Sequence, residues 1–141
     1  MNEEEINELE EGSKLDLDFS KLKKVVSGSD DVIPVAVQDS ETKEVILVAY
    51  TNQFAMEESL RTRIATFWST SRRELWIKGK TSGHTFELVE ARVNCEQNSL
   101  VYLVKPKGGG ICHTNNSDGE PRDCYYRKID FDDGSLINSN P

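Results

Sequence analysis

The alternation of apolar and polar residues along the chain predicts a set of short strands. Residues 32–38 and 45–50 are rich in β-branched side chains and flank the polar segment 39–44, a pattern typical of a β-hairpin. Further strands are expected at 64–70, 75–78, 84–94, where apolar residues mostly alternate with polar ones, 99–104 and 124–130, the last of which is the final strand expected. Polar turns join most neighbouring segments, which favours an antiparallel sheet.

A helical pattern interrupts the strands in the middle of the chain. Asn52 is a suitable N-cap for a helix over 53–63, in which Phe54, Met56 and Leu60 share one side and are expected to pack in the core. These elements predict an α+β fold with a mostly antiparallel sheet and one main helix.

The N-terminal residues carry weaker signals. A short helix is expected over 2–11, where glutamates occupy most positions, so it is expected to be a solvated appendage. Leu15, Leu17 and Phe19 alternate with polar residues, which predicts one extended edge segment. Residues 27–31 have the composition of a loop.

One domain accounts for most of the chain. Residues 32–131 are expected to form it, after an N-terminal extension, 1–31, and before a disordered, flexible tail, 132–141. Residues 105–110 are expected to form a mobile loop. A length of 141 residues suits one core, and a hydrophobic fraction of 36% leaves modest material for it. Burial against a second subunit would therefore help.

The charge and the termini restrict the partners. A net charge of −8 argues against a nucleic-acid or anionic-membrane partner, and an anionic phosphate substrate would need a local basic pocket. The acidic N-terminus lacks the regions of a signal peptide, and no apolar run approaches the roughly 20 residues that cross a bilayer. An odd number of cysteines without an export signal predicts reduced thiols in a cytoplasmic compartment.

The three cysteines, Cys95, Cys112 and Cys124, are candidate zinc ligands. Their wide spacing lacks the close CxxC pairs of a zinc ribbon, so spacing alone is a weak signal. Each cysteine stands at an expected strand end or turn, where distant segments can converge. Three protein ligands leave one coordination place open, as in a catalytic zinc site. The alternative interpretation is three small, buried, reduced thiols, the usual state of free cysteine.

An ordered series of motifs covers roughly residues 32–127. It comprises the runs 33–39, 45–52, 65–72, 74–79 and 81–85, then Cys95, Cys112-His113-Thr114 and Cys124-Tyr125-Tyr126-Arg127. The series resembles the phosphoribosyl-AMP cyclohydrolase family of histidine biosynthesis. The resemblance implies an intertwined, obligate homodimer with a zinc site shared between subunits. It also implies hydrolytic opening of the adenine ring of phosphoribosyl-AMP at C6–N1, giving the formimino-aminoimidazole carboxamide ribonucleotide.

The resemblance carries zinc ligation onto Cys95, Cys112 and Cys124. His113, next to a ligand, is the first candidate for proton transfer and His84 the second, because imidazole titrates near neutrality. A lone histidine is more often structural, so a structural role stays open for both.

A phosphate site is expected near the turn Thr81-Ser82-Gly83, which offers hydroxyls and backbone N–H groups. Cations for phosphate are expected from Arg72, Arg73 and Lys78, with the planar arginine fork better suited to bidentate binding. The alternative is an ordinary polar turn with solvated basic residues. Trp68 and Trp76 are expected to pack against the sheet, and a ring at a strand end can also stack on a base.

Two departures from the family pattern bear on the substrate. The family carries an Asp-Cys-Asp-x-Asp pattern that holds magnesium, where this chain has Asn94, Glu96 and Asn98, so weak magnesium binding is expected. The link 115–123 is also longer than the family's. These changes keep two alternatives open: a paralogous zinc hydrolase or deaminase acting on another purine-like ring, and a non-catalytic homodimer tied by zinc. Retention of both histidines and all three cysteines favours an enzyme.

Overall fold

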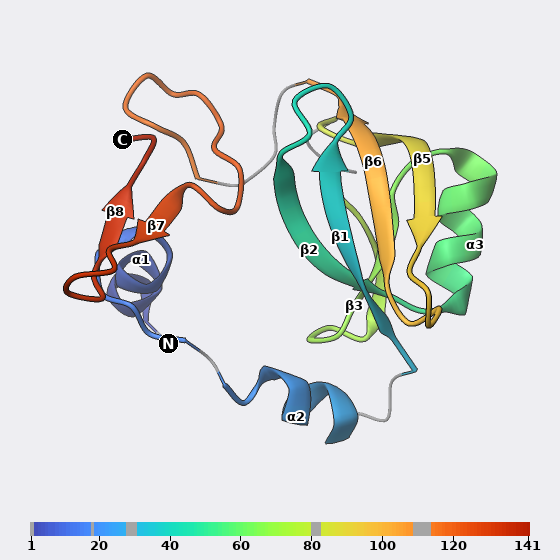
Figure 1. Ribbon diagram of the computed structural model, residues 1–141, viewed down its shortest axis with the longest axis horizontal. Helices are drawn as coiled ribbons and strands as arrows, with labels where there is room; N and C mark the ends of the chain where they lie inside the picture. Colours follow the sequence, from blue (N-terminus) through green and yellow to red (C-terminus); the bar gives the residue numbers. More distant parts are fainter. Residues whose placement is uncertain (1, 18, 28–30, 80–82, 109–113) are drawn as a thin grey trace.

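A four-stranded sheet is the centre of the fold (Figure 1). The computed structural model describes residues 2–17, 19–27, 31–79, 83–108 and 114–141, and side chains of Ile6 and Val26 are not described. The elements in chain order are α1 (Glu3–Glu11), α2 (Lys21–Ser27), β1 (Ile33–Asp39), β2 (Val45–Thr51), α3 (Gln53–Thr62), β3 (Thr66–Ser69), β4 (Glu74–Ile77), β5 (Phe86–Val93), β6 (Leu100–Pro106), β7 (Arg127–Ile129) and β8 (Leu136–Asn138). The predicted α+β class with a mostly antiparallel sheet is confirmed.

The sheet has the strand order β2-β1-β6-β5. Strands β1 and β2 form the predicted hairpin, and β5 and β6 form a second antiparallel pair. The two antiparallel pairs are joined into one sheet by the parallel pairing of β1 with β6. Asp39 fixes the first turn, since its carboxylate accepts the N–H groups of Glu41 and Thr42 at 2.8 and 3.1 Å. Strands β2 and β5 are consequently the two edges of the sheet.

The core lies against the sheet and under the separate β3–β4 hairpin. Phe67 of β3 is fully buried, with its ring 5.5 Å from that of Trp76 and 6.1 Å from that of Tyr102. Trp76 is partly buried against the core, as predicted. The buried aliphatic and aromatic residues are Val35, Val37, Ile46, Ala49, Ala65, Phe67, Phe86, Leu88, Leu100, Tyr102 and Val104.

Helix α3 has the predicted N-cap, and Met56 packs against the core as predicted, but Phe54 and Leu60 do not. The Asn52 side chain accepts the N–H of Ala55 at 2.8 Å. Phe54 and Leu60 are 56% and 42% exposed, so the prediction that they pack in the core is wrong. The buried helical residues are Ala55 and Ser59, and the Ser59 hydroxyl accepts the Thr66 N–H at 2.8 Å. Small residues allow close approach of the helix to β3, which turns the larger side chains outwards.

The two termini pack on each other rather than on the sheet (Figure 1). Helix α1 forms as predicted, but it contacts the C-terminal segment instead of standing alone in solvent. The tail 132–141, expected to be disordered, contains β8, which pairs with β7. The extended edge segment expected around Leu15 to Phe19 is also wrong, because its described residues form no strand and helix α2 follows. None of the described helices has the length and apolarity to span a membrane.

Candidate functional site

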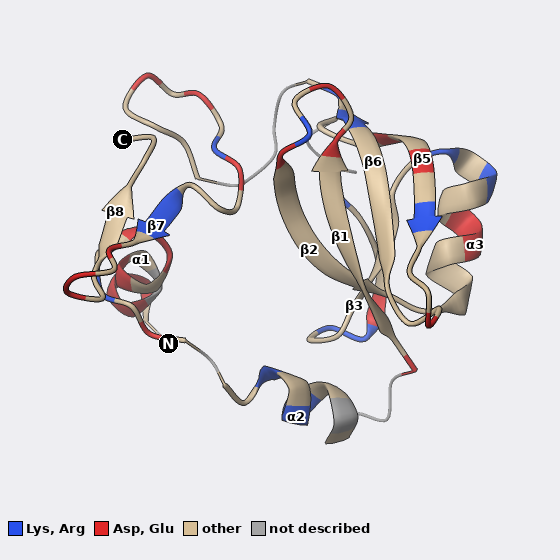
Figure 2. Cartoon of the chain, viewed as in Figure 1, with Lys and Arg blue, Asp and Glu red and all other residues tan. Residues whose placement is uncertain are grey.

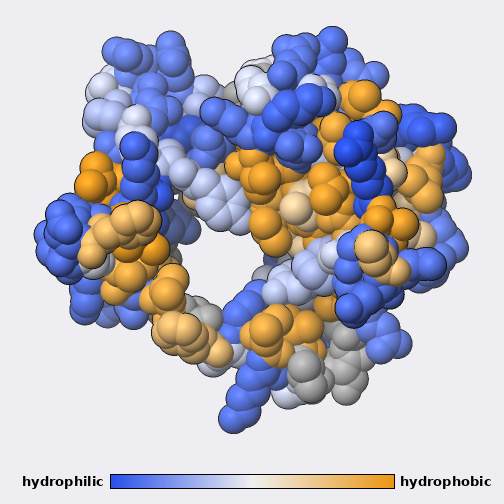
Figure 3. Space-filling model, in the orientation of Figure 1, coloured by the Kyte–Doolittle hydropathy of each residue, from blue (hydrophilic) through white to orange (hydrophobic). Residues whose placement is uncertain are grey.

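A pocket of about 740 Å³ lies between β2, the β3–β4 hairpin and the N-terminal elements. Trp68, Arg72 and Trp76, three of the predicted substrate-binding residues, line it together. The pocket also includes side chains that the sequence did not single out: Glu10, Lys21, Leu47, Val48, Ala49, Tyr50, Ser69, Thr70 and Ser71. Figure 3 shows an opening through the centre of the molecule, with apolar side chains on the side of the sheet. The volume of the pocket suits a small ligand.

Hydroxyl and cationic groups gather at the β3–β4 turn inside this pocket. The Ser69 hydroxyl accepts the backbone N–H of Arg72 at 3.2 Å and lies 3.4 Å from the Ser71 hydroxyl. The exposed Arg72 guanidinium is 3.6 Å from the Glu74 carboxylate. Lys21 donates to the Thr70 hydroxyl at 2.9 Å. The turn therefore presents several hydrogen-bonding groups suited to an anion.

Other predicted phosphate-binding residues lie elsewhere. Arg73 is exposed with φ 55° and does not line the pocket. The Lys78 ammonium sits 5.7 Å from the centroid of the Phe86 ring. Gly83 donates its N–H to the Gly79 carbonyl at 2.8 Å. Thr81 and Ser82 lie outside the described residues, so the phosphate-binding turn stays a prediction.

His84 lies against Gly108, the first glycine of the run 108–110. A Cβ added to Gly108 would come within 2.5 Å of the His84 ring carbon Cδ2, and Gly108 has φ +71°. A Cβ on Gly79, with φ +79°, would meet the His84 carbonyl oxygen at 2.1 Å. Glycine at both positions therefore makes room for the imidazole and its backbone. His113, the first candidate for proton transfer, lies outside the described residues.

Cys95 and Cys124 lie at opposite edges of the four-stranded sheet. Cys95 follows β5 in the turn to β6, and the Cys124 N–H donates to the Ile46 carbonyl of edge strand β2 at 3.2 Å. Three strand spacings separate these edges, about 14 Å at ~4.8 Å each. Both residues are exposed, which contradicts the interpretation of buried thiols. Within the described parts of one chain, no group of three potential metal ligands converges. Cys112 falls outside them.

The turn after β5 uses its own polar groups. The Asn94 side-chain oxygen accepts the N–H groups of Asn98 and Ser99, each at 2.9 Å. The Asn94 amide donates to the Asn98 side-chain oxygen at 2.6 Å, and Asn98 donates to the Glu96 carboxylate at 3.3 Å. The side-chain oxygens expected to face magnesium therefore already accept protein hydrogen bonds.

Cys124 belongs to a segment anchored by the buried side chain of Arg122. This guanidinium donates to the Asn140 carbonyl at 2.8 Å and to the Glu11 carboxylate at 3.0 Å, and it lies 4.4 Å from the Tyr126 ring centroid. The Tyr126 hydroxyl donates to the Glu10 carbonyl at 2.8 Å. Arg122 thus joins helix α1, the C-terminal tail and the link 115–123.

Tyr125, beside Cys124, has a raised pKa, first through partial burial of its hydroxyl and then through the thiolate charge of Cys124.

Replacing Arg122 with methionine is expected to lower the free energy of unfolding by about 2 kcal/mol, because buried charge-assisted hydrogen bonds are lost. Urea unfolding followed by circular dichroism measures this difference. The control is Arg61→Met, which removes an exposed helix pair with Glu58 and should leave stability nearly unchanged. Equal stability of the Arg122 variant and the wild-type chain would show that the termini are not joined in solution.

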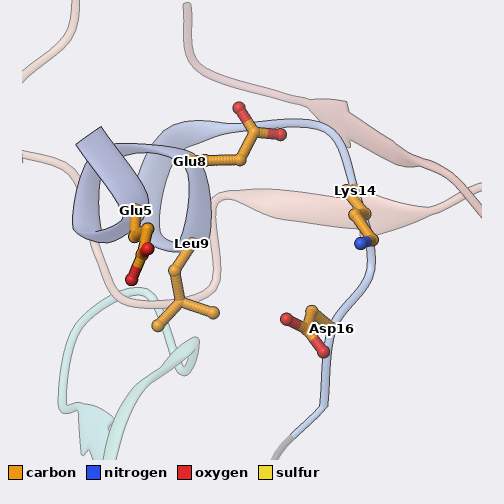
Figure 4. Close-up of a pocket in the computed structure, with 5 residues that line it drawn as sticks. All are labelled: Glu5, Glu8, Leu9, Lys14 and Asp16. Atoms are coloured by element: carbon orange, nitrogen blue, oxygen red, sulfur yellow. The ribbon is translucent and has the colours of Figure 1, made fainter. Parts of the chain in front are cut away.

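A second pocket, of about 360 Å³, lies beside helix α1 (Figure 4). Its lining is Glu5, Glu8, Leu9, Lys14 and Asp16. Figure 4 shows Glu5 and Leu9 on one side and Lys14 and Asp16 on the other. Three carboxylates against one ammonium disfavour an anionic ligand, so this pocket is unsuited to a phosphorylated substrate.

The α+β sheet and its pocket of indole rings, hydroxyls and cations define a domain suited to binding a small ligand. The family model for phosphoribosyl-AMP cyclohydrolase matches residues 47–126. The chain belongs to the phosphoribosyl-AMP cyclohydrolase family.

Individual relatives agree with the family model. The phosphoribosyl-AMP cyclohydrolase of Archaeoglobus fulgidus is 44% identical over 102 residues, covering 72% of this chain and 89% of the relative. That of Nitrosopumilus maritimus is 41% identical over 114 residues, covering 81% and 94%. The histidine biosynthesis bifunctional protein HisIE of Thermus thermophilus is 50% identical over 98 residues, 70% of this chain. The match spans 43% of that longer protein, so its second activity is not carried over.

Proposed function

We propose that the chain hydrolyses phosphoribosyl-AMP in histidine biosynthesis, opening the adenine ring at the C6–N1 bond. The observation that carries the proposal is the pocket in which Trp68, Arg72 and Trp76 meet, in a chain of the phosphoribosyl-AMP cyclohydrolase family. Indole faces suit a purine ring, and a guanidinium suits a phosphate. The reaction adds water across C6–N1, so a proton must leave the water and another must reach N1.

The two histidines are proposed for these proton transfers. His84 is packed against Gly108 at the entrance to the segment of Cys112 and His113. Imidazole suits both directions of transfer because it titrates near neutral pH. His113 is the first choice for the general base and His84 the second.

Zinc is the proposed metal, bound by the thiolates of Cys95, Cys112 and Cys124. One observation supports it, the exposure of Cys95 and Cys124, together with the general preference of zinc for thiolate ligands. When bound by three protein ligands, zinc lowers the pKa of a coordinated water towards ~7 and so supplies a nucleophile at neutral pH.

The proposed zinc site requires two copies of the chain. Cys95 and Cys124 belong to opposite edges of one sheet, so a single copy does not bring them together. A homodimer with the site between subunits resolves this, with Cys95 from one copy and Cys124 from the other. The termini support such an assembly, because Phe19 and Phe131 are 90% and 99% exposed. Large apolar side chains at the surface are typical of interfaces.

Product analysis tests the proposed reaction against a related one. The second candidate is hydrolysis or deamination of another purine-like ring. It is favoured by the amide side chains of Asn94 and Asn98 and by the long link 115–123. The purified chain is incubated with phosphoribosyl-AMP, and the products are identified by mass spectrometry. Addition of one water with retention of the amino nitrogen supports ring opening. Loss of ammonia would show deamination of this nucleotide in place of ring opening, and an unchanged nucleotide refutes the proposed reaction and is the result expected if the chain acts on another ring.

Magnesium binding to the substrate-free chain is expected to be weak, without saturation below about 1 mM. Glu96 supplies one carboxylate. The side-chain oxygens of Asn94 and Asn98 carry no formal charge and already accept hydrogen bonds within the turn. Isothermal titration with magnesium chloride measures the affinity. Any magnesium requirement should appear with the phosphate-bearing substrate. Tight binding in its absence would contradict the expectation, and Asn94→Asp would then change the affinity little.

A further inference from the structure

Lys21 brings a positive charge from the N-terminal extension into the pocket of Trp68 and Arg72. Its ammonium nitrogen Nζ donates to Thr70 Oγ1 at 2.9 Å, and both residues line the pocket. Lys21 opens helix α2, outside the residues 47–126 that the family model matches. The N-terminal extension therefore contributes to a pocket that the family-matched segment does not complete by itself.

The groups around Lys21 form a chemical set suited to a phosphate. Within the part of the chain that the structure describes, Thr70 is the hydrogen-bond partner of the ammonium, so further N–H bonds are available for a ligand. The hydroxyls of Ser69 and Ser71 and the guanidinium of Arg72 line the same pocket. Charged donors and hydroxyls bind phosphate oxygens strongly.

The local charge supports the same ligand. Two cations, Lys21 and Arg72, line the pocket against one lining carboxylate, Glu10, with Glu74 next to Arg72 at 3.6 Å, in a chain whose net charge is −8. Figure 2 shows basic residues on α2 and at the β3–β4 turn, whereas α1 is largely acidic. An anion attracted to this otherwise acidic molecule would find its favourable position between α2 and the β3–β4 turn.

One lining residue of the pocket, Trp68, carries an unsatisfied donor. The indole Nε1–H of Trp68 is buried and has no acceptor among the described residues. A buried donor without an acceptor is unfavourable, and it leaves one unsatisfied hydrogen-bonding group in a residue that lines the pocket. Trp68 lines the pocket together with Lys21.

We propose that Lys21, with Thr70 and Arg72, binds a phosphate of a phosphoribosylated purine nucleotide, whose base lies beside Trp68 and Trp76. The identity of the nucleotide rests on the proposed function. The phosphate site itself rests on the contacts of Lys21 and on the composition of the pocket.

The test compares AMP with adenosine, which differ by one phosphate. Both tryptophans of the chain line the pocket, so quenching of intrinsic fluorescence reports its occupancy. The wild-type chain is expected to bind AMP more tightly than adenosine. Lys21→Met should weaken AMP binding about tenfold or more, the usual effect of losing a charge-assisted hydrogen bond, and leave adenosine binding unchanged. Lys21→Arg should keep most of the AMP affinity.

The matched control is Lys23→Met, which removes the same charge from an exposed position of the same helix. It should leave AMP binding unchanged. Thr70→Val gives a second variant on another element and should also weaken AMP selectively. With phosphoribosyl-AMP, Lys21→Met should raise KM while kcat stays within about threefold, since binding and not chemistry is affected. Thermal unfolding of each variant verifies that it is folded.

Three results would overturn the proposal: equal affinities of the wild-type chain for AMP and adenosine, equal effects of Lys21→Met and Lys23→Met, or an unchanged KM in Lys21→Met. The test separates this proposal from the proposed reaction. A chain that loses AMP selectivity in Lys21→Met but does not hydrolyse phosphoribosyl-AMP keeps the phosphate site and refutes the reaction. Hydrolysis of phosphoribosyl-AMP with the same KM in Lys21→Met and the wild-type chain supports the reaction and refutes the phosphate site.

Discussion

Cys124→Ser is expected to remove zinc from the protein and to lower turnover of phosphoribosyl-AMP by more than roughly a hundredfold. Removing a residue that only hydrogen-bonds to a metal ligand typically lowers metal affinity or activity 10- to 100-fold, so loss of a ligand itself should lower them more. Elemental analysis of protein purified without chelators measures zinc, expected at about one per subunit in the wild-type chain. Sedimentation of the same samples measures the dimer, which should weaken when the metal is lost.

Cys124→His is the control for this change, because imidazole retains a zinc ligand at the same position. It is expected to keep more zinc than Cys124→Ser, although its activity need not return fully. A wild-type chain that contains no zinc, together with a Cys124→Ser variant of unchanged activity, would exclude a catalytic metal at this position.

His113→Ala is expected to lower kcat by about a hundredfold or more while zinc content stays unchanged. A positioned general acid–base typically contributes 10²–10⁴-fold. His84→Ala provides the comparison, since His84 is the second candidate and lies against Gly108. Turnover and zinc content are measured on the same preparation.

The two readouts distinguish the roles of His113. Survival of activity in His113→Ala would assign the proton transfer to His84 or to a chain of waters. Loss of activity together with zinc would make His113 a metal ligand or a structural residue. The proposed general base therefore requires low kcat with full zinc occupancy.

The sequence was sufficient to predict the central strands. In β1 the buried Val35 and Val37 alternate with less buried residues, whereas β6 buries Tyr102, Leu103 and Val104 in succession. Apolar and β-branched composition, which is also local in the chain, predicted these strands. The Asn52 cap was equally local, since it binds an N–H three residues away. The packing face of α3 was not, because it depends on the close approach of Ser59 to Thr66 across the fold.

The candidate site was predicted in part for the same reason. Trp68 and Trp76 come from the paired strands of one hairpin and Arg72 from its turn, so their meeting in a pocket follows from local pairing. Lys21 was missed, because helix α2 had no distinct apolar period and its contact with Thr70 spans 49 residues of sequence. The tail was misjudged because β8 is stabilised by β7 and by Ser13, not by its own composition.

The separation of Cys95 from Cys124 also required the strand order. A sequence shows that both stand near strand ends, but only the order β2-β1-β6-β5 places them at opposite edges. The proposed zinc site therefore takes Cys95 from one copy of the chain and Cys124 from the other.

Mixing two inactive variants, Cys95→Ser and Cys124→Ser, tests that statement most directly. The variants are co-expressed with different affinity tags, and the phosphoribosyl-AMP cyclohydrolase activity and zinc content of the mixture are measured. If each site takes Cys95 from one copy and Cys124 from the other, a mixed dimer has one intact site, and random pairing restores about a quarter of wild-type activity. If all ligands of a site come from one copy, every site carries a substitution, and the mixture stays as inactive as its parents.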